Sequence, residues 1–301
     1  MKSIVMSRAK TWQVLLVAVS LLIVSLGGTA AAADVKVYAF SSVSFWYDKE
    51  VFVTGATGRW HWPVPFFIIK HDNDWVAFDL GVTGEVAKDK AAQEAYYGSS
   101  RMKDYDPYEM KPDADFVNSI KKLGLKPEQL KAVILSHGHW DHVGGINEFK
   151  NTKVPIYIQE KEMPAIWQAI GANIGKLTYN IVDWANIAKL NLKPINGVFD
   201  VFGDGSVVAF PATGHSAGIQ GLMVRQNSGR YLILAQDSCN TTENYQKVVA
   251  GRVTNETLLQ TLAWYKAMSY MADIVPSHDQ DYYAEVRWAP AEFQVPPKYR
   301  K

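Results

Sequence analysis

The sequence predicts one domain of the α/β or α+β class, with two β-sheets covered by helices. Short runs of β-branched and aromatic residues, separated by glycine and proline, indicate strands, and amphipathic helical segments lie between the later runs. The 301 residues are 48% hydrophobic and 20% charged, a globular balance that excludes a disordered or collagen-like chain. A chain of this length can bury a sizeable core.

Residues 1–33 are expected to form a secretory signal peptide. Lys2, Arg8 and Lys10 precede an uncharged apolar run, which ends in a glycine pair and four alanines. The alternative, an uncleaved anchor, is disfavoured because the apolar run is short for a membrane span of roughly 20 residues. Cleavage would leave a domain at residues 34–301, periplasmic or secreted and without a stable membrane anchor. It would also change the formal net charge from +1 to −2, because the removed segment has three basic and no acidic residues.

The first half of the domain is predicted to begin with strands. Their β-branched and aromatic composition places them at residues 35–40, 64–70, 75–79, 132–135 and 155–158. Between them, residues 113–123 have helical spacing, with Phe116, Ile120 and Leu123 on one face and Gly124 as a C-cap.

The second half alternates between the two element types. Residues 163–192 are aromatic and partly helical, and they are expected to be an insertion on the substrate side. Residues 257–271 form a helix with Leu258 and Leu262 on one side. The remaining strands are expected at residues 207–210, 222–224, 231–234 and 274–275.

The segment His137-Gly138-His139-Trp140-Asp141-His142 has the composition of a metal site. It places three imidazoles and one carboxylate within six residues, directly after an apolar strand. Imidazole and carboxylate suit zinc, manganese or iron. In an extended segment His137 and His139 point the same way, whereas Asp141 and His142 lie past the turn and face a second position.

Three more ligand candidates lie at the ends of later strands. His215, Asp237 and His278 each follow an apolar run, in loops of the kind where binding sites concentrate. His61 and His71 have no such context and are interpreted as non-ligands. The single cysteine, Cys239, excludes an intramolecular disulfide; it is expected to be a small buried apolar residue, and a metal-proximal thiol is the alternative.

The order of these residues resembles the metallo-β-lactamase superfamily. The resemblance implies a four-layer αβ/βα sandwich with a dinuclear site at one edge, and Asp79 resembles the family's structural hydrogen-bonding aspartate. The implied ions are two divalent metals, with zinc expected and iron, manganese or cobalt open. The implied ligands are His137, His139 and His215 for one ion, Asp141, His142 and His278 for the second, and Asp237 as a bridge.

Within this superfamily the chain resembles the N-acyl homoserine lactonases. The segments Gly214-His215-Ser216-Ala217-Gly218 and 237–244 are similar to theirs. The lactonases place a tyrosine three residues after the bridging aspartate, where this chain has Asn240. An amide can donate a hydrogen bond to a developing oxyanion, but it cannot act as an acid. Asp141, Asp237 and Asn240 are therefore the expected catalytic residues.

The expected function is hydrolysis of a lactone or other carboxylic ester, of the quorum-quenching type. The resemblance implies attack by a metal-bridging hydroxide, with Asp141 or Asp237 moving the proton. The open alternatives are hydrolysis of a β-lactam, phosphodiester or sulfate ester on the same metal core, or a non-catalytic periplasmic binding protein with a vestigial site. The expected partner is a small-molecule substrate, and a homodimer is left open. Nucleic acid is not expected, because the 31 basic and 30 acidic residues nearly balance.

Tryptophans flank the expected site in sequence. They suggest an aromatic-walled mouth for an apolar acyl chain, and ordinary core packing is the equally supported alternative. The tryptophans concerned are Trp46, Trp60, Trp62, Trp167 and Trp184.

Overall fold

The computed structural model describes residues 33–98, 106–110, 112–171 and 178–300. The expected signal peptide lies outside the described residues, apart from its last position. Within the described part, no helix combines the length and apolar character needed to cross a membrane.

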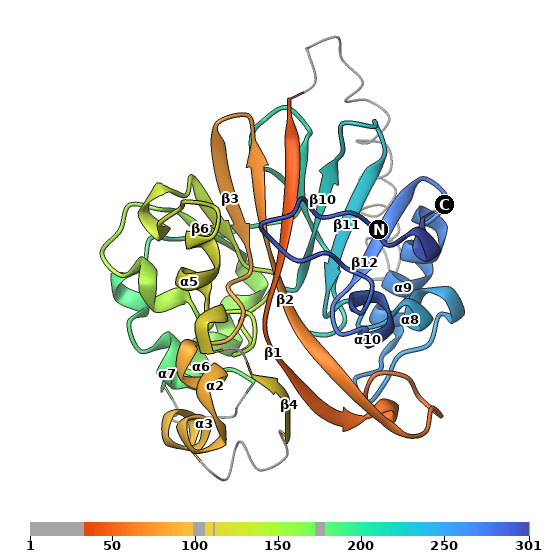
Figure 1. Cartoon of the computed structure of the whole chain (residues 1–301), viewed down its shortest axis with the longest axis horizontal. Helices are drawn as coiled ribbons and strands as arrows, with labels where there is room; N and C mark the ends of the chain where they lie inside the picture. Colours follow the sequence, from red (N-terminus) through yellow and green to blue (C-terminus); the bar gives the residue numbers. More distant parts are fainter. Residues whose placement is uncertain (1–32, 99–105, 111, 172–177, 301) are drawn as a thin grey trace, which may run out of the picture.

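Two β-sheets form the centre of the molecule (Figure 1). The seven-stranded sheet has the order β4-β1-β2-β3-β5-β6-β7; its first four strands pair antiparallel, and β3, β5, β6 and β7 pair parallel. Its strands are β1 (Val35–Asp48), β2 (Arg59–His71), β3 (Asp74–Phe78), β4 (Asp106–Met110), β5 (Ala132–Ile134), β6 (Ile156–Gln159) and β7 (Leu192–Ile195).

The second sheet has five strands in the order β12-β11-β10-β9-β8. All its pairs are antiparallel except β11 with β12. Its strands are β8 (Phe199–Asp200), β9 (Val207–Pro211), β10 (Gln220–Arg225), β11 (Tyr231–Gln236) and β12 (Ala272–Pro276).

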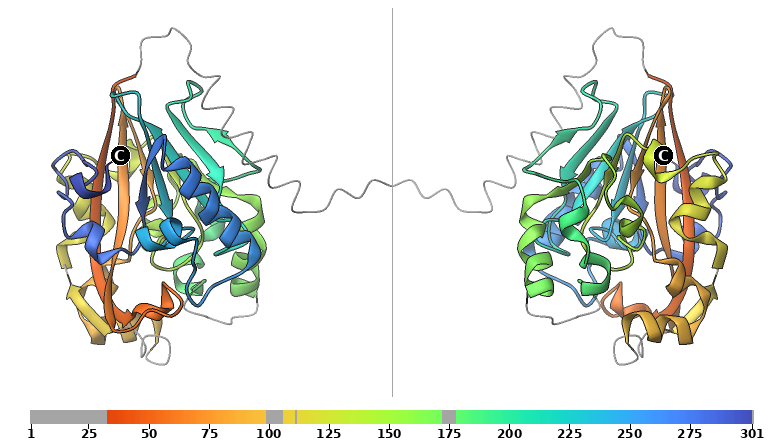
Figure 2. Two further views of the ribbon diagram at one scale, coloured as in Figure 1. Left: turned by 90° about the vertical axis from the view of Figure 1, so that its right-hand side faces the viewer. Right: turned by 90° about the vertical axis from the view of Figure 1, so that its left-hand side faces the viewer.

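Helices cover the outer face of each sheet. Figure 2 shows α9 lying across the second sheet, and Figure 1 shows the group from α2 to α7 beside the first sheet. The helices are α2 (Gly84–Lys88), α3 (Lys90–Tyr97), α5 (Phe116–Lys121), α6 (Met163–Gly171), α7 (Ile181–Trp184), α8 (Thr242–Lys247), α9 (Glu256–Met268) and α10 (Gln280–Tyr283).

Alternating side chains of the strands separate the apolar core into layers. In β5, Ile134 faces the core between the sheets, together with Leu234 of β11, whereas Val133 faces the helical side. On the outer face of the second sheet, Ile233 packs with Leu262 of α9. Two sheets, each buried on both faces, therefore give the four-layer αβ/βα sandwich that the resemblance predicted.

The first hairpin is longer than the sequence predicted. β1 and β2 remain paired to their far ends, where Phe45 lies opposite Trp62 and Tyr47 lies opposite Trp60. The sequence prediction ended the first strand at residue 40 and began the second at residue 64, so it excluded Pro63 and included Pro65. The pairing of β1 and β2 has an irregularity between Ser41 and Ser44, opposite these prolines, and so tolerates the missing donors.

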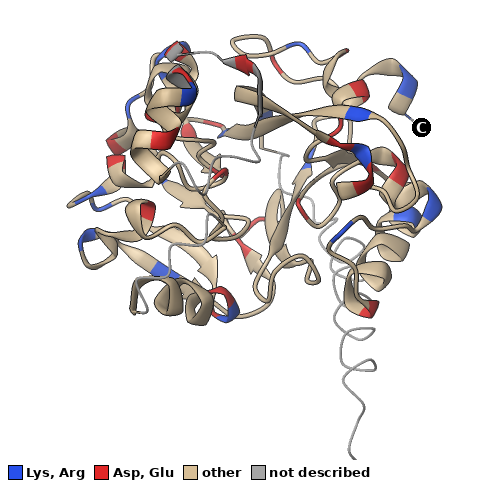
Figure 3. Ribbon diagram, turned by 90° about the horizontal axis from the view of Figure 1, so that it is seen from below, with Lys and Arg blue, Asp and Glu red and all other residues tan. Residues whose placement is uncertain are grey.

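Other boundaries also differ from the expectation. The helix predicted over residues 113–123 is shorter, because Asp115 caps α5 by accepting from the backbone N–H of Asn118. The prediction missed β4, β7 and β8, which are short strands at the edges of the two sheets. Basic and acidic residues are interspersed over the elements of the fold (Figure 3).

Candidate metal centre

Four loops meet at one edge of the sandwich. The loop after β5 carries His137, His139, Asp141 and His142, and the loops after β9, β11 and β12 carry the other candidates: His215, Asp237 and His278. The structure thus brings all seven predicted ligand residues together, although they come from two different sheets.

The seven side chains form two groups that share Asp237. Within each group the candidate ligand atoms lie within 4.8 Å of one another. The first group is His137, His139, His215 and Asp237, and the second is Asp141, His142, Asp237 and His278.

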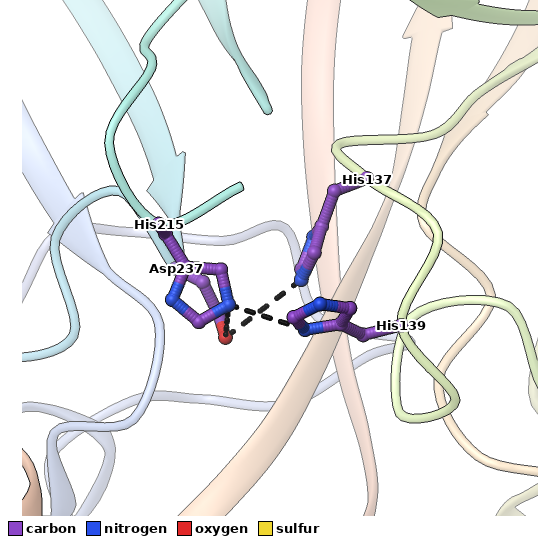
Figure 4. Close-up of side chains that lie close together, drawn as sticks. All are labelled: His137, His139, His215 and Asp237. Carbon is purple, nitrogen blue, oxygen red and sulfur yellow. Dashed lines mark hydrogen bonds and ion pairs between the residues drawn. The ribbon is translucent and has the colours of Figure 1, made fainter. Parts of the chain in front are cut away.

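In the first group the imidazoles converge on one carboxylate oxygen (Figure 4). Asp237 Oδ2 lies 3.3 Å from His215 Nε2 and 3.9 Å from His137 Nε2. His139 Nδ1 lies 3.1 Å from His215 Nε2.

In the second group the other oxygen of the same carboxylate is central. Asp237 Oδ1 lies 3.2 Å from His142 Nε2 and 3.0 Å from His278 Nε2. Asp141 Oδ2 lies 3.5 Å from His142 Nε2 and 3.9 Å from His278 Nε2. Each oxygen of Asp237 therefore faces a different group, which is the arrangement of a bridging carboxylate.

The residues fit two divalent ions. Nε2 of His137 and Nε2 of His142 are buried and have no hydrogen-bond partner, and leaving such an atom unpaired costs about 1–3 kcal/mol. A cation at the centre of each group would satisfy both atoms. The donor set of imidazole nitrogens and carboxylate oxygens suits zinc and its neighbours in the first transition row.

Burial and neighbouring charges hold the ligand side chains in the protonation states that bind metal ions. Burial and the neighbouring His215 lower the pKa of His139 to about 3, and burial lowers that of His137 well below its usual value. Burial alone would raise the pKa of Asp237, but His278, His142 and His215 hold it well below the usual range. These groups are therefore neutral imidazoles and an ionised carboxylate, the forms that bind metal.

His142 differs from the other histidines. Burial alone would lower its pKa, but Asp141, Asp237 and Asp79 raise it well above the usual value. In the absence of a cation this imidazole carries a proton among three carboxylates. A metal ion in the second group would displace that proton.

Asp79 supports the second group through four hydrogen bonds. His142 Nδ1 lies 2.8 Å from its Oδ2, and Gln236 Nε2 donates to the same oxygen at 2.7 Å. The backbone N–H and the hydroxyl of Ser136 donate at 2.6 and 2.7 Å. Asp79 and Gln236 both have left-handed backbones, with φ of 60° and 47°, which cost energy at residues other than glycine. The resemblance predicted a hydrogen-bonding role for Asp79, and the structure shows one.

Hydrogen bonds also orient two other ligand side chains of the second group, those of His278 and Asp237. His278 Nδ1 lies 2.8 Å from the carbonyl oxygen of Pro63, and the hydroxyl of Ser277 donates to Asp237 Oδ1 at 2.7 Å. Neither Pro63 nor Ser277 was predicted as a site residue. Ser277 directly precedes a candidate ligand, which was the available signal.

A cavity of about 440 Å³ opens next to both groups. Its walls come from the tip of the first hairpin, the loop after β11, residues 250–253 and α9. Among the lining residues the apolar ones include Val51, Phe52, Trp62, Trp140, Leu258 and Leu262, and the polar ones include Asn240 and Arg252. Asn240 is half-buried and lines the cavity, and its Oδ1 atom is itself buried without a hydrogen-bond partner.

The five predicted tryptophans differ in their surroundings. Trp46 is half-buried outside the cavity lining, with the Arg59 guanidinium 4.9 Å from its ring. Trp62 lines the cavity, with its ring 4.7 Å from that of His278. Trp60 and Trp184 are buried and donate to the backbone carbonyls of His278 and Gly138, while Trp167 is 52% exposed. For Trp60 and Trp184, core packing is the better description. Trp140, within the histidine motif, is a cavity residue that the aromatic hypothesis did not include.

The remaining candidates lie outside both ligand groups. Cys239 is buried, its Sγ donates to the carbonyl oxygen of Thr241, and burial raises its pKa. His71 stacks on Phe202 at 3.9 Å and lies 2.8 Å from Asp204. Neither His71 nor His61 is a member of either group.

Comparison with known proteins agrees with this geometry. A family model described as the metallo-beta-lactamase superfamily matches residues 60–234. The chain is 32% identical to N-acyl homoserine lactonase AttM of Rhizobium radiobacter over 241 residues, which are 76% of this chain and 86% of that protein. It is 26% identical to an N-acyl homoserine lactonase of Bacillus cereus over 62% of this chain and 68% of that protein.

Solved structures share the fold. A Bacillus thuringiensis AiiA variant with N-decanoyl-L-homoserine bound at its active site superposes with a TM-score of 0.72 at 24% identity, covering 87% of this chain and all of that one. AidC, a dizinc quorum-quenching lactonase, gives a TM-score of 0.57 at 13% identity, covering 88% and 95%. The predicted sandwich is thus confirmed, and the chain belongs to the metallo-β-lactamase superfamily.

Proposed function

We propose that this chain is a dinuclear metal-dependent lactonase that opens the ring of N-acyl homoserine lactones. The similarity to N-acyl homoserine lactonases such as AttM supports the metal-dependent hydrolase that the sequence predicted. The observation that carries the finer proposal is the position of the cavity: both ligand groups form its polar end, and apolar side chains such as Phe52 and Leu258 line its walls. A polar lactone joined to an apolar acyl chain has the same two-part chemistry.

Each residue of the site has a distinct role in this proposal. When bound, two divalent ions, zinc being the proposed metal, supply a water of lowered pKa and an electrophile for the carbonyl oxygen. Asp141 and Asp237 remain ionised and can accept a proton. The amide N–H of Asn240, a residue of the cavity lining, can donate to the carbonyl oxygen as it gains charge.

Asn240 also limits where a proton can come from. Ring opening releases an alkoxide that must be protonated, and a side-chain amide has no proton to give. The proton therefore returns from Asp141 or Asp237, the carboxylates that accepted one earlier. A lactonase with a tyrosine at this position has a second donor, so this chain is expected to depend more strongly on its carboxylates.

A substrate panel tests the proposal. The purified chain, loaded with zinc, is followed by pH-stat on N-acyl homoserine lactones, other esters, nitrocefin, a phosphodiester and a sulfate ester. We expect the fastest turnover on the lactones and none by an Asp237→Ala variant. Preference for nitrocefin, the phosphodiester or the sulfate ester would replace the lactone with that substrate class. Sedimentation of the same sample tests the homodimer.

We also propose that the protein is exported, and that residues 1–33 are removed. The support is the order of basic residues, apolar run and alanines in the sequence. Fractionation of cells that express the full chain, with N-terminal sequencing of the product, is the test. Export predicts a mature N-terminus near residue 34 and a periplasmic or extracellular pool, whereas an intact N-terminus in the cytoplasmic fraction contradicts it.

A further inference from the structure

A buried carboxylate lies behind the first ligand group. Glu162 belongs to a short 3-10 turn, Glu160–Glu162, which directly follows β6. Because β6 pairs parallel with β5, this turn emerges at the same sheet edge as the histidine loop. The side chain of Glu162 is fully buried.

Four neutral donors occupy the two oxygens of Glu162. Oε1 accepts from the backbone N–H of Gly138 at 3.0 Å and from the hydroxyl of Tyr179 at 2.6 Å. Oε2 accepts from the hydroxyl of Ser216 at 2.8 Å and from the backbone N–H of Gly218 at 2.9 Å. A carboxylate group offers about four acceptor positions and no donor. The four donors around Glu162 therefore match a carboxylate, and they would not match the amide of a glutamine.

These donors are the immediate neighbours of the first ligand group. Gly138 lies between His137 and His139, and Ser216 follows His215. The ring of Tyr179 also contacts that of His139, at 4.7 Å and nearly perpendicular. One carboxylate therefore ties the histidine loop of the first sheet to the His215 loop of the second sheet.

The backbone packs too closely here to allow much adjustment. A β-carbon on Gly218 would collide with the backbone of Glu162, and one on Gly138 would meet Tyr179 and Ile166 at 3.0 and 3.1 Å. Only a glycine lets each loop approach the carboxylate and the side chains around it. The hydrogen bonds and the steric fit thus act on the same two loops.

We propose that Glu162 is a positioning residue for the first metal ion, which holds His137, His139 and His215 in binding geometry across the two sheets. Residues that orient metal ligands typically change metal affinity or activity 10–100-fold when they are replaced. Because Glu162 contacts neither Asp141, His142 nor His278, its effect should be confined to one of the two ions. The inference rests on the dinuclear centre of the proposed function, but not on the substrate.

Metal binding by the purified full-length protein tests the proposal. Zinc and cobalt are titrated against a competing chelator for the wild type, Glu162→Gln, Ser216→Ala and Tyr179→Phe. Glutamine keeps the size but places an N–H₂ group among donors. We expect Glu162→Gln to weaken the affinity for one ion about 10–100-fold and to change the affinity for the other less than about twofold. Ser216→Ala and Tyr179→Phe, which each remove one donor, should have smaller effects in the same direction.

Two controls separate positioning from general damage. Glu160→Gln changes an exposed acid of the same turn and should leave both affinities unchanged. His139→Ala is expected to lose the first ion, and adding Glu162→Gln in that background should then cause no further loss of the second ion. If Glu162→Gln does not fold, Tyr179→Phe and Ser216→Ala carry the test alone.

The possible outcomes distinguish this inference from the proposed function. If Glu162→Gln weakened the affinity for both ions equally, or for neither ion, the proposed role of Glu162 would be wrong while the dinuclear centre would stand. A wild-type protein that binds fewer than two ions would overturn the dinuclear centre and this inference with it. Two bound ions without lactone hydrolysis would overturn only the substrate.

Discussion

The two ligand groups are supported by two different buried carboxylates. Behind the first group, Glu162 accepts from two backbone N–H groups and two hydroxyls, and so acts on the loops that carry the histidines. Behind the second group, Asp79 bonds directly to a ligand imidazole, that of His142. The comparison indicates that each ion has its own supporting carboxylate. The two groups are linked at Asp237 and through the Ser136 hydroxyl, which donates to Asp79 and lies 2.9 Å from His137 Nδ1.

The largest effect is expected at the residue common to both groups. Asp237→Ala removes an oxygen from each group, and it also leaves the Ser277 hydroxyl without its acceptor. We expect bound metal to fall toward one equivalent and turnover to become undetectable, as measured by elemental analysis and pH-stat. Asp204→Ala, outside both groups, is the control. Two retained ions with full activity would show that Asp237 does not bridge.

Asp79→Asn should weaken the ion of the second group. The amide removes a charge beside His142 and replaces an acceptor with an N–H₂ group, so we expect a loss of about 10–100-fold in affinity for one ion. Chelator competition measures this affinity, and Asp74→Asn, at the half-buried first position of β3, serves as the control. The ion lost should differ from the one lost in Glu162→Gln. Loss of the same ion in both variants would break the comparison.

Trp62→Ala tests the cavity wall beside the second group. Its indole contributes apolar surface next to His278, and removing it should raise KM for long-chain lactones by roughly 3–10-fold, about 1 kcal/mol of lost apolar contact. Short-chain substrates should change less. Trp60→Ala, at a buried residue outside the cavity lining, should lower Tm and affect both chain lengths equally. An equal effect of Trp62→Ala on long-chain and short-chain substrates would show that Trp62 contributes to core packing and not to acyl-chain binding.

The smallest effect is expected at Cys239. Although this thiol lies two residues from Asp237, burial raises its pKa, so little thiolate forms at pH 8. Iodoacetamide should modify the native protein very slowly and the denatured protein readily, as followed by mass spectrometry. Cys239→Ala should retain both ions. Rapid alkylation of the native protein, or loss of an ion in the variant, would favour the metal-proximal thiol.

The histidine motif shows why part of the site could be predicted from sequence. His137, His139, Asp141 and His142 come from one loop, and local spacing alone placed them together. His215, Asp237 and His278 could be proposed only because each follows an apolar strand, and their assignment to two groups came from the family resemblance. The hairpin extension was missed because the pairing of β1 with β2 continues through Pro63 to the far ends of both strands, and the predicted strands stopped before that part.

By itself the sequence determined the fold class, the position of every ligand candidate in a loop after a strand, and the pattern of polar and apolar residues. These properties depend on residues that are neighbours in the sequence. Only the tertiary structure decided which loops meet, that Trp62 and Trp140 line the cavity while Trp60 and Trp184 are core, and that Glu162 joins two sheets behind the first group. Glu162 lies 24 residues from Gly138 and 56 from Gly218. Contacts over such separations depend on the packing of the sheets, and no local pattern of residues encodes them.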